Sequence, residues 1–350
     1  MKLSKKPKKQ TMILEETIST FTSIMKWAKL LGALPFRWNE KKRRIYVTKS
    51  YFALGRFALI VYGWLVYLGS LLYVLIYAYL ENIQLYMYTR FVVILVGGLL
   101  PVMLLISNIL KEQEIKSWVN SVLKFESWFS ASFLKLEKSE PIPIAKSISS
   151  ALRIAVLCCK SYGMAVFTFA VTFPYEPFFV LTHLPLEFRH SIFALGHACS
   201  AAIFIFALGT AIIYNLGIFL LFAVVIYGVL NELESSPKNR YRSHGYLRIS
   251  ENTRLAYRSL SLLWIIMTDW IRPFVMPVQT LIVRSVQICN FVVIKYRMDI
   301  TALDIPLMVG YSVIFGTGWL GIMGMAGSFT KSSRRVLRSF KNIGPISSVV

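Results

Sequence analysis

Residues 191–230 read SIFALGHACSAAIFIFALGTAIIYNLGIFLLFAVVIYGVL and contain no Asp, Glu, Lys or Arg. A helix of ~40 residues would be about 60 Å long at ~1.5 Å per residue, whereas the hydrocarbon core of a bilayer is ~30 Å thick. The surface helix of a soluble domain keeps a polar face, and this stretch has none. We therefore predict a membrane protein built around one helix that crosses the bilayer and continues beyond it.

Composition and charge agree with a membrane protein. Hydrophobic residues make up 56% of the 350 residues and charged residues 16%, compared with about 25% charged in a typical soluble domain. The net charge of +22 does not point to nucleic acid, because 14 of the 39 basic residues cluster in residues 1–56, before the first apolar run. Lys and Arg are retained beside spans on the cytoplasmic side, and they favour anionic lipid headgroups.

The apolar runs predict an all-α polytopic transmembrane bundle of six spans with a very long fourth helix. Residues 1–56 form a basic cytoplasmic arm, in which 13–34 has the pattern of a membrane-surface helix, and 330–350 form a basic tail. Residues 259–295 are open to two interpretations: a cytoplasmic helical extension followed by one span, or two short spans. Taking the first, the bundle covers 57–329, with spans at about 57–80, 91–110, 161–182, 191–230, 277–294 and 305–329.

The distribution of basic residues predicts the orientation. The segments before, between and after the six spans contain 14, 1, 8, 1, 7, 2 and 5 Lys plus Arg in order along the chain. The rich and poor segments alternate, so both termini are expected in the cytoplasm. Splitting 259–295 into two spans would move the basic tail to the outside and is therefore disfavoured.

Polar groups inside the apolar runs are the candidate functional residues, since charge is costly there. Glu176 lies near the outer end of the third span, and Arg284 lies inside the fifth, followed by Gln287 and Asn290. We hypothesise that Glu176 and Arg284 face one outward cavity, as a pair or as contacts for a polar ligand. The pattern also fits an interfacial glutamate and a snorkelling arginine.

Aromatic residues and chemical motifs complete the sequence evidence. The chain has no Gly-rich phosphate loop and no HExxH, and its four histidines lack metal-ligand spacing, so we expect neither an enzyme nor a metal or other cofactor. The aromatic candidates for lining a ligand cavity between spans three, four and six, where packing alone would also explain them, are Phe173, Tyr175, Tyr214, Tyr311 and Trp319.

Three short segments carry a family resemblance. LGALPFRW at 31–38, with the basic stretch that follows it, resembles the N-terminal juxtamembrane segment of insect-type gustatory receptors. SFTKSSRRVLRSFK at 328–341 is similar to the cytoplasmic end of that family's sixth helix, and YRSL at 257–260 to the start of its fifth. The order of a cytoplasmic N-terminus, a long fourth helix and a polar second inner loop also fits.

The resemblance implies a tetrameric, ligand-gated cation channel of the plasma membrane whose outer cavity binds sugars, bitter compounds or other small molecules. Family members have seven helices, and the seventh lines the pore with a Thr-Tyr-apolar-Gln-Phe signature that this sequence lacks. We therefore expect a homo- or hetero-oligomeric chemosensory channel subunit that is either truncated before the pore-lining helix or dependent on partner chains for conduction. The alternatives are a multi-pass transporter and a membrane-embedded lipid-modifying enzyme.

Overall fold

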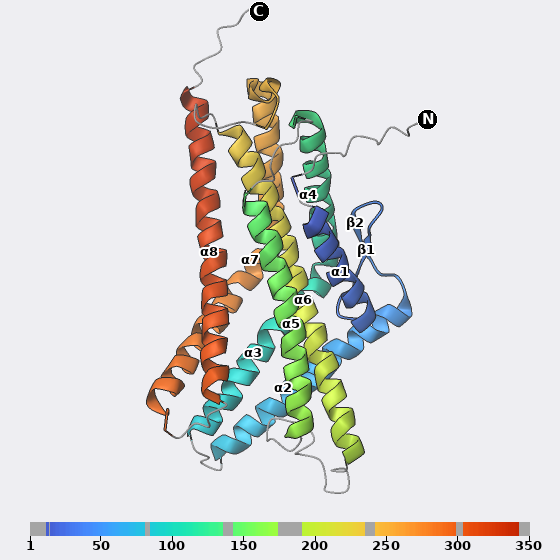
Figure 1. Cartoon of the computed structure of the whole chain (residues 1–350), viewed down its shortest axis with the longest axis vertical. Coiled ribbons are helices and arrows are strands. Elements are labelled where there is room, and N and C mark those ends of the chain that lie inside the picture. Colours follow the sequence, from blue (N-terminus) through green and yellow to red (C-terminus); the bar gives the residue numbers. More distant parts are fainter. Residues whose placement is uncertain are drawn as a thin grey trace, which may run out of the picture.

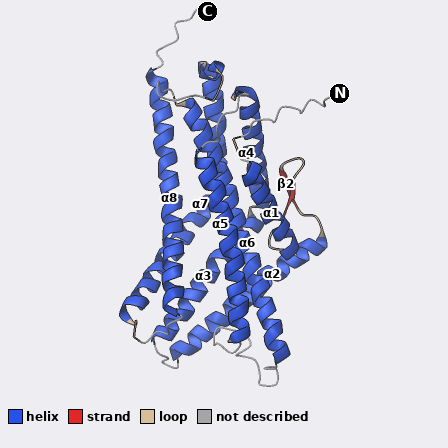
Figure 2. Ribbon diagram, viewed as in Figure 1, coloured by secondary structure: helices blue, strands red, loops and turns tan. Residues whose placement is uncertain are grey.

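The computed structural model describes residues 12–13, 15–80, 85–135, 143–173, 191–234, 242–298 and 304–342. Two short strands and a 3-10 helix, Gly245–Arg248, accompany the long helices (Figures 1 and 2). The elements are α1 (Glu15–Leu31), β1 (Phe36–Asn39), β2 (Arg44–Val47), α2 (Tyr51–Leu80), α3 (Leu85–Leu110), α4 (Glu112–Phe133), α5 (Pro143–Thr172), α6 (Ser191–Leu233), α7 (Ser250–Lys295) and α8 (Asp304–Asn342).

The predicted fold class is confirmed. Five of the described helices, α2, α5, α6, α7 and α8, are long and apolar enough to cross a membrane. A sixth candidate is the bent pair α3 and α4, which meet at an angle of 84°. Of that pair, α3 carries the apolar run expected at 91–110. The chain is thus an all-α polytopic bundle of membrane-spanning helices.

The central helix is α6, and it spans 43 residues as one unbroken element. In its most apolar window 72% of the residues are buried by other parts of the chain, whereas the corresponding share is 28% or less in the other four candidate spans. A helix that is apolar on every side is stable when its whole circumference is covered by neighbours or lipid. Figure 1 shows α6 in the middle of the bundle, beside α5.

The two helices that follow α6 are also longer than a membrane crossing. α7 runs for 46 residues and contains Pro273 and Pro277, so residues 259–295 form one continuous helix and not two short spans. α8 runs for 39 residues and passes the expected end of the sixth span at Phe329. α5 begins at Pro143, well before the span expected at 161–182, and its described part ends at Thr172.

The first described residues form a folded unit. α1 buries one face against the bundle, where Phe21 and Ala28 have no exposed surface. The strands β1 and β2 pair antiparallel in a hairpin, and the amide side chain of Asn120 on α4 bonds both backbone groups of Ile45, at 2.8 and 2.9 Å. The helix expected on the membrane surface therefore packs into the molecule along one face.

The molecule has two halves along its long axis. One contains α1, the hairpin, α4, the starts of α5 and α7 and the C-terminal ends of α6 and α8 (Figure 1). The other contains α2, α3 and the remaining parts of α5 to α8. We expect the first to lie outside the membrane and call it the extramembrane half, because it includes the charged, amphipathic helix α4 and the basic end of α8.

Candidate functional site

One of the predicted site residues, Asn290, forms a hydrogen bond that joins α7 to α8. The hydroxyl group of Ser312 donates a hydrogen bond of 2.8 Å to Oδ1 of Asn290. Ser312 is buried, with 7% of its surface exposed. Hydrogen bonds between membrane helices replace contacts that lipid cannot offer, so this bond fixes the register of the two helices.

Tyr311 lies next to this bond and brings α3 into the same place. Its ring stacks on that of Phe315, with 4.2 Å between the ring centroids. The side chain of Ser285 on α7 lies near its phenol group, and the Ser285 hydroxyl donates a hydrogen bond of 2.7 Å to the backbone carbonyl of Leu281. A Cβ atom placed on Gly97 of α3 would lie 2.9 Å from the Tyr311 hydroxyl oxygen, so the absence of a side chain at Gly97 makes room for Tyr311.

We define the α7–α8 seam as Ser285 and Asn290 on α7 together with Tyr311 and Ser312 on α8. The sequence predicted Asn290 and Tyr311, and the structure brings them to the same contact region. Ser285 and Ser312 were missed, because serines are common in membrane helices and nothing in one sequence shows which of them face a neighbouring helix. The seam places hydrogen-bond donors and acceptors between two helices of an apolar bundle, with Ser285 and Ser312 buried and Asn290 exposed.

The other predicted residues have different surroundings. Arg284 and Gln287 are on α7 near the seam and have exposed side chains. Trp319, two turns beyond Tyr311 on α8, is half-buried. Phe173, just after the end of α5, is 43% exposed and contacts the ring of Phe169 on that helix. Tyr175 and Glu176 lie outside the described residues, so the pairing of Glu176 with Arg284 stays a prediction.

Tyr214 lies against the N-terminal unit. Its side chain is fully buried, and its ring is 5.5 Å from that of Phe36 on β1 and 6.0 Å from that of Phe21 on α1. These neighbours come from residues that precede the first span. The contacts of Tyr214 thus join the central helix to the folded N-terminal unit, whereas those of Tyr311 join α3, α7 and α8.

Two buried carboxylates in the extramembrane half were not among the sequence candidates. Glu126 on α4 accepts hydrogen bonds from the backbone N–H of Met12 at 2.7 Å and the hydroxyl of Ser130 at 3.2 Å. Glu232 near the end of α6 accepts from the backbone N–H groups of Arg242 and Ser243 at 3.1 and 3.0 Å. Each residue is 4% exposed. Glu126 binds the backbone of a segment distant in sequence, and Glu232 binds the backbone of the segment that follows its own helix.

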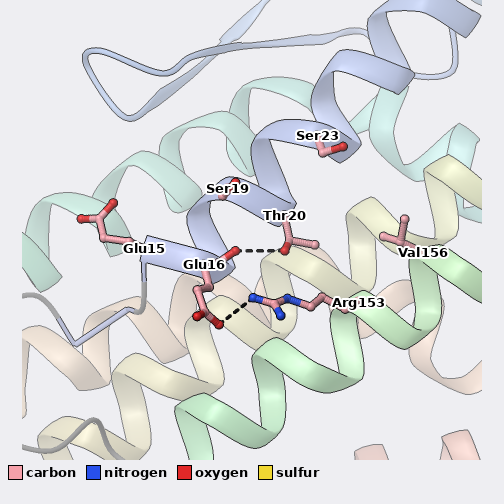
Figure 3. Close-up of a pocket in the computed structure, with 7 residues that line it drawn as sticks. All are labelled: Glu15, Glu16, Ser19, Thr20, Ser23, Arg153 and Val156. Atoms are coloured by element: carbon pink, nitrogen blue, oxygen red, sulfur yellow. Dashed lines mark hydrogen bonds and ion pairs between the residues drawn. The ribbon is translucent and has the colours of Figure 1, made fainter.

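An open groove of about 540 Å³ lies between α1 and α5. Figure 3 shows Glu16 and Arg153 pointing toward each other across it, with an ion pair of 2.6 Å. Ser19, Thr20 and Ser23 line the α1 side. The second acid at this end of α1, Glu15, pairs with Arg43 of the hairpin turn, also at 2.6 Å. Pairing satisfies these charges, so the groove is an ion-paired junction between α1 and its neighbours.

In the described part of the chain, no three His, Cys, Asp or Glu side chains lie close enough together to bind a metal ion. The fold and the seam define the class: a polytopic helical membrane protein with a small polar contact region between its later helices. No protein-family model, no curated protein and no solved structure matches the chain. The gustatory-receptor resemblance therefore rests on the three short segments and the order of the helices.

Proposed function

We propose that this chain is a subunit of a ligand-gated cation channel of the chemosensory type, in which a small molecule binds at the α7–α8 seam. The seam is the observation that carries the proposal. It lies where α3, α7 and α8 meet, so a ligand that displaced Tyr311 from its place beside Gly97 would alter the contact of α3 with α8. A ligand that prefers one arrangement of the helices shifts the population toward it.

The exposed surface of α8 supports an assembly of several subunits. Small residues in membrane helices allow the close approach of a second helix. In α8, a Cβ atom placed on Gly318, Gly321 or Gly324 would meet nothing within 4 Å in the described structure. Only 12% of the apolar window of α8 is buried. This surface is available to another chain, and a tetramer is the assembly that the family resemblance implies.

The proposed setting is the plasma membrane, with the extramembrane half and both termini in the cytoplasm. The alternation of basic residues along the chain supports this orientation. In such a setting the seam would lie toward the outer side of the membrane, in the half of the molecule away from α4 (Figure 1). Ions would flow between subunits or along a helix supplied by a partner chain.

Whole-cell current recording tests the proposal. Cells expressing this chain alone, and with a seven-helix member of the gustatory receptor family, are exposed to fructose, sucrose, caffeine and quinine. We expect an evoked cation current in at least one condition, and current only on co-expression would assign a subunit role. Surface-expressed protein with no current in either condition would contradict the channel proposal, and uptake of a compound without current would favour the transporter alternative.

Paired tyrosine variants locate the ligand. Tyr311→Phe keeps the ring and removes one hydroxyl group, whose hydrogen bond is worth about 1 kcal/mol. We expect the half-maximal ligand concentration to shift by about fivefold, since ~1.4 kcal/mol corresponds to tenfold. Tyr62→Phe is the matched control, because Tyr62 is 67% exposed on α2. Equal responses of both variants and the unchanged chain would exclude the Tyr311 hydroxyl from ligand binding.

A further inference from the structure

The C-terminal end of α1, the first turns of α2 and one lysine of α5 meet at a single corner of the molecule. We propose that this corner binds the headgroup of an anionic phospholipid. We call it the α1–α2 corner and define it by Lys26, Trp27, Lys29, Phe52, Arg56 and Lys160. The proposal goes beyond channel function, because it depends on insertion of the chain in a bilayer and not on whether the chain conducts ions.

Arg56 fixes the geometry of the corner. Its guanidinium group donates hydrogen bonds to the backbone carbonyls of Lys29 and Leu30, at 3.0 and 3.1 Å. These carbonyls belong to the last turn of α1, where the helix dipole places partial negative charge. Gly32 ends α1 with a positive φ of 71°, and a Cβ atom there would be 2.9 Å from Cβ of Arg56. The end of α1 is thus held against the start of α2.

Lys160 adds the third element. Its Nζ atom lies 5.7 Å from the centre of the Trp27 ring, a cation–π contact between α5 and α1. Trp27 is nevertheless 44% exposed and Phe52 75% exposed. Lys26 and Lys29, within two residues of Trp27 on α1, also have exposed side chains. The corner therefore combines exposed aromatic side chains with lysines from α1 and α5.

The corner lies at the depth of lipid headgroups. The apolar run of α2 begins at Tyr51, so the membrane surface passes close to the first turns of that helix. Tryptophan and lysine side chains are favoured at this depth, with the aromatic body in the acyl boundary and the charge toward the headgroups. The proposed occupant lies in the leaflet that faces the extramembrane half.

The charges of the corner have one sign. The acidic residues of α1, Glu15 and Glu16, are at its opposite end and pair with Arg43 and Arg153. Among the residues that the structure describes, none of the four cations of the corner forms an ion pair with a carboxylate. A lipid phosphate or a serine carboxylate would supply the missing negative charge.

Native mass spectrometry of the full chain in detergent tests the proposal, with phosphatidylserine or phosphatidylcholine added as the probe. We expect the unchanged chain to retain phosphatidylserine preferentially. The double variant Lys29→Gln/Lys160→Gln should weaken that preference by about fivefold per lysine. The control is Lys124→Gln/Lys135→Gln, which removes the same charge from two exposed positions, one on α4 and one just after its end. It should leave the preference unchanged.

The outcomes separate a built site from general attraction. Equal losses in the corner pair and the control pair, or no preference in the unchanged chain, would overturn the proposal. The charge-conserving pair Lys29→Arg/Lys160→Arg should keep the preference, and its loss would also count against the site. If the Lys29→Gln/Lys160→Gln protein aggregates in size-exclusion chromatography, the single variant Lys29→Gln replaces it as the test. We then expect the preference for phosphatidylserine to fall by about fivefold. An unchanged preference would count against the site.

Discussion

Single side chains join segments that are far apart in the sequence of this protein. The indole N–H of Trp118 on α4 donates a hydrogen bond of 2.9 Å to the backbone carbonyl of Leu263 on α7. Glu126 joins α4 to the start of the described chain, because its carboxylate accepts a hydrogen bond from the backbone N–H of Met12, 114 residues away. An unpaired buried polar group costs about 1–3 kcal/mol, so these bonds also specify which segments pack together.

The ionisation of Glu126 should couple stability to pH. Burial raises the pKa of its carboxyl group above the ordinary value of 4.5, more than the hydrogen bonds from Met12 and Ser130 and the charge of Arg43 lower it. The folded chain then keeps a proton that the unfolded chain has lost. The contribution of Glu126 to the unfolding free energy is therefore most favourable below 4.5 and declines as the pH rises through the raised value.

Thermal unfolding in detergent across the range from pH 4.5 to pH 8 measures this coupling. The glutamine in Glu126→Gln has no proton to lose in this range. The Tm of the variant minus the Tm of the unchanged chain should therefore increase as the pH rises. Glu40→Gln, at an exposed position in the hairpin turn, is the control and should show no such trend. A constant difference in Tm between Glu126→Gln and the unchanged chain at every pH would refute the coupling.

At the scale of elements, α5 and α6 pack by fitting side chains of one helix onto glycines of the other. A Cβ atom on Gly163 of α5 would meet the ring of Phe206, at 2.6 Å from its nearest atoms. A Cβ atom on Gly209 of α6 would collide with Sγ of Cys159. The two contacts are reciprocal, because each helix supplies one glycine and one larger side chain. Close packing of this kind drives helix association where the solvent is lipid.

This packing predicts a rescue between two positions. Gly209→Ala should destabilise the folded chain by about 1–3 kcal/mol, the usual cost of overpacking. Cys159→Ala removes the sulfur atom, so the double variant Gly209→Ala/Cys159→Ala should recover most of the loss in Tm. Gly196→Ala, on the same helix with nothing within 4 Å of the added atom, should cost nothing. Additive effects of the two substitutions would show that they do not share a contact.

Sequence reasoning succeeded where composition alone decides the element. The charge-free run at 191–230 predicted α6 nearly to its ends. Two short spans in 259–295 were disfavoured because they would move the basic tail at 330–350 outside, and the structure shows one helix there. It did not find the hairpin, whose four-residue strands depend on Asn120, 75 residues beyond Ile45, for their attachment to α4. Nor did it place Tyr214, because a helix apolar on all sides gives no signal of which neighbour covers which face.

At the scale of the whole molecule, coverage of the apolar helices is uneven. α6 is enclosed, whereas α5 and α8 have only 11% and 12% of their most apolar windows buried. Lipid or other subunits must cover this surface, since contiguous exposed apolar area of such extent is not stable in water. The extramembrane half instead uses ion pairs, such as the 3.6 Å contact of Arg335 on α8 with Glu234 after α6.

The orientation of the molecule gives the last prediction. With six crossings the two ends of the chain would lie on one side of the membrane, and from the basic residues in 1–56 and 330–350 we predict that this side is the cytoplasm. Epitope tags at either terminus should be unreactive with antibody in intact cells and reactive after permeabilisation. A tag inserted between residues 186 and 187, in the expected outer link, should be reactive in intact cells and serves as the positive control. A C-terminal tag reactive without permeabilisation would mean an odd number of crossings. The α3–α4 pair, bent by 84°, would then be the first candidate for a segment that does not cross the membrane, because the count is six spans with this pair and five without it.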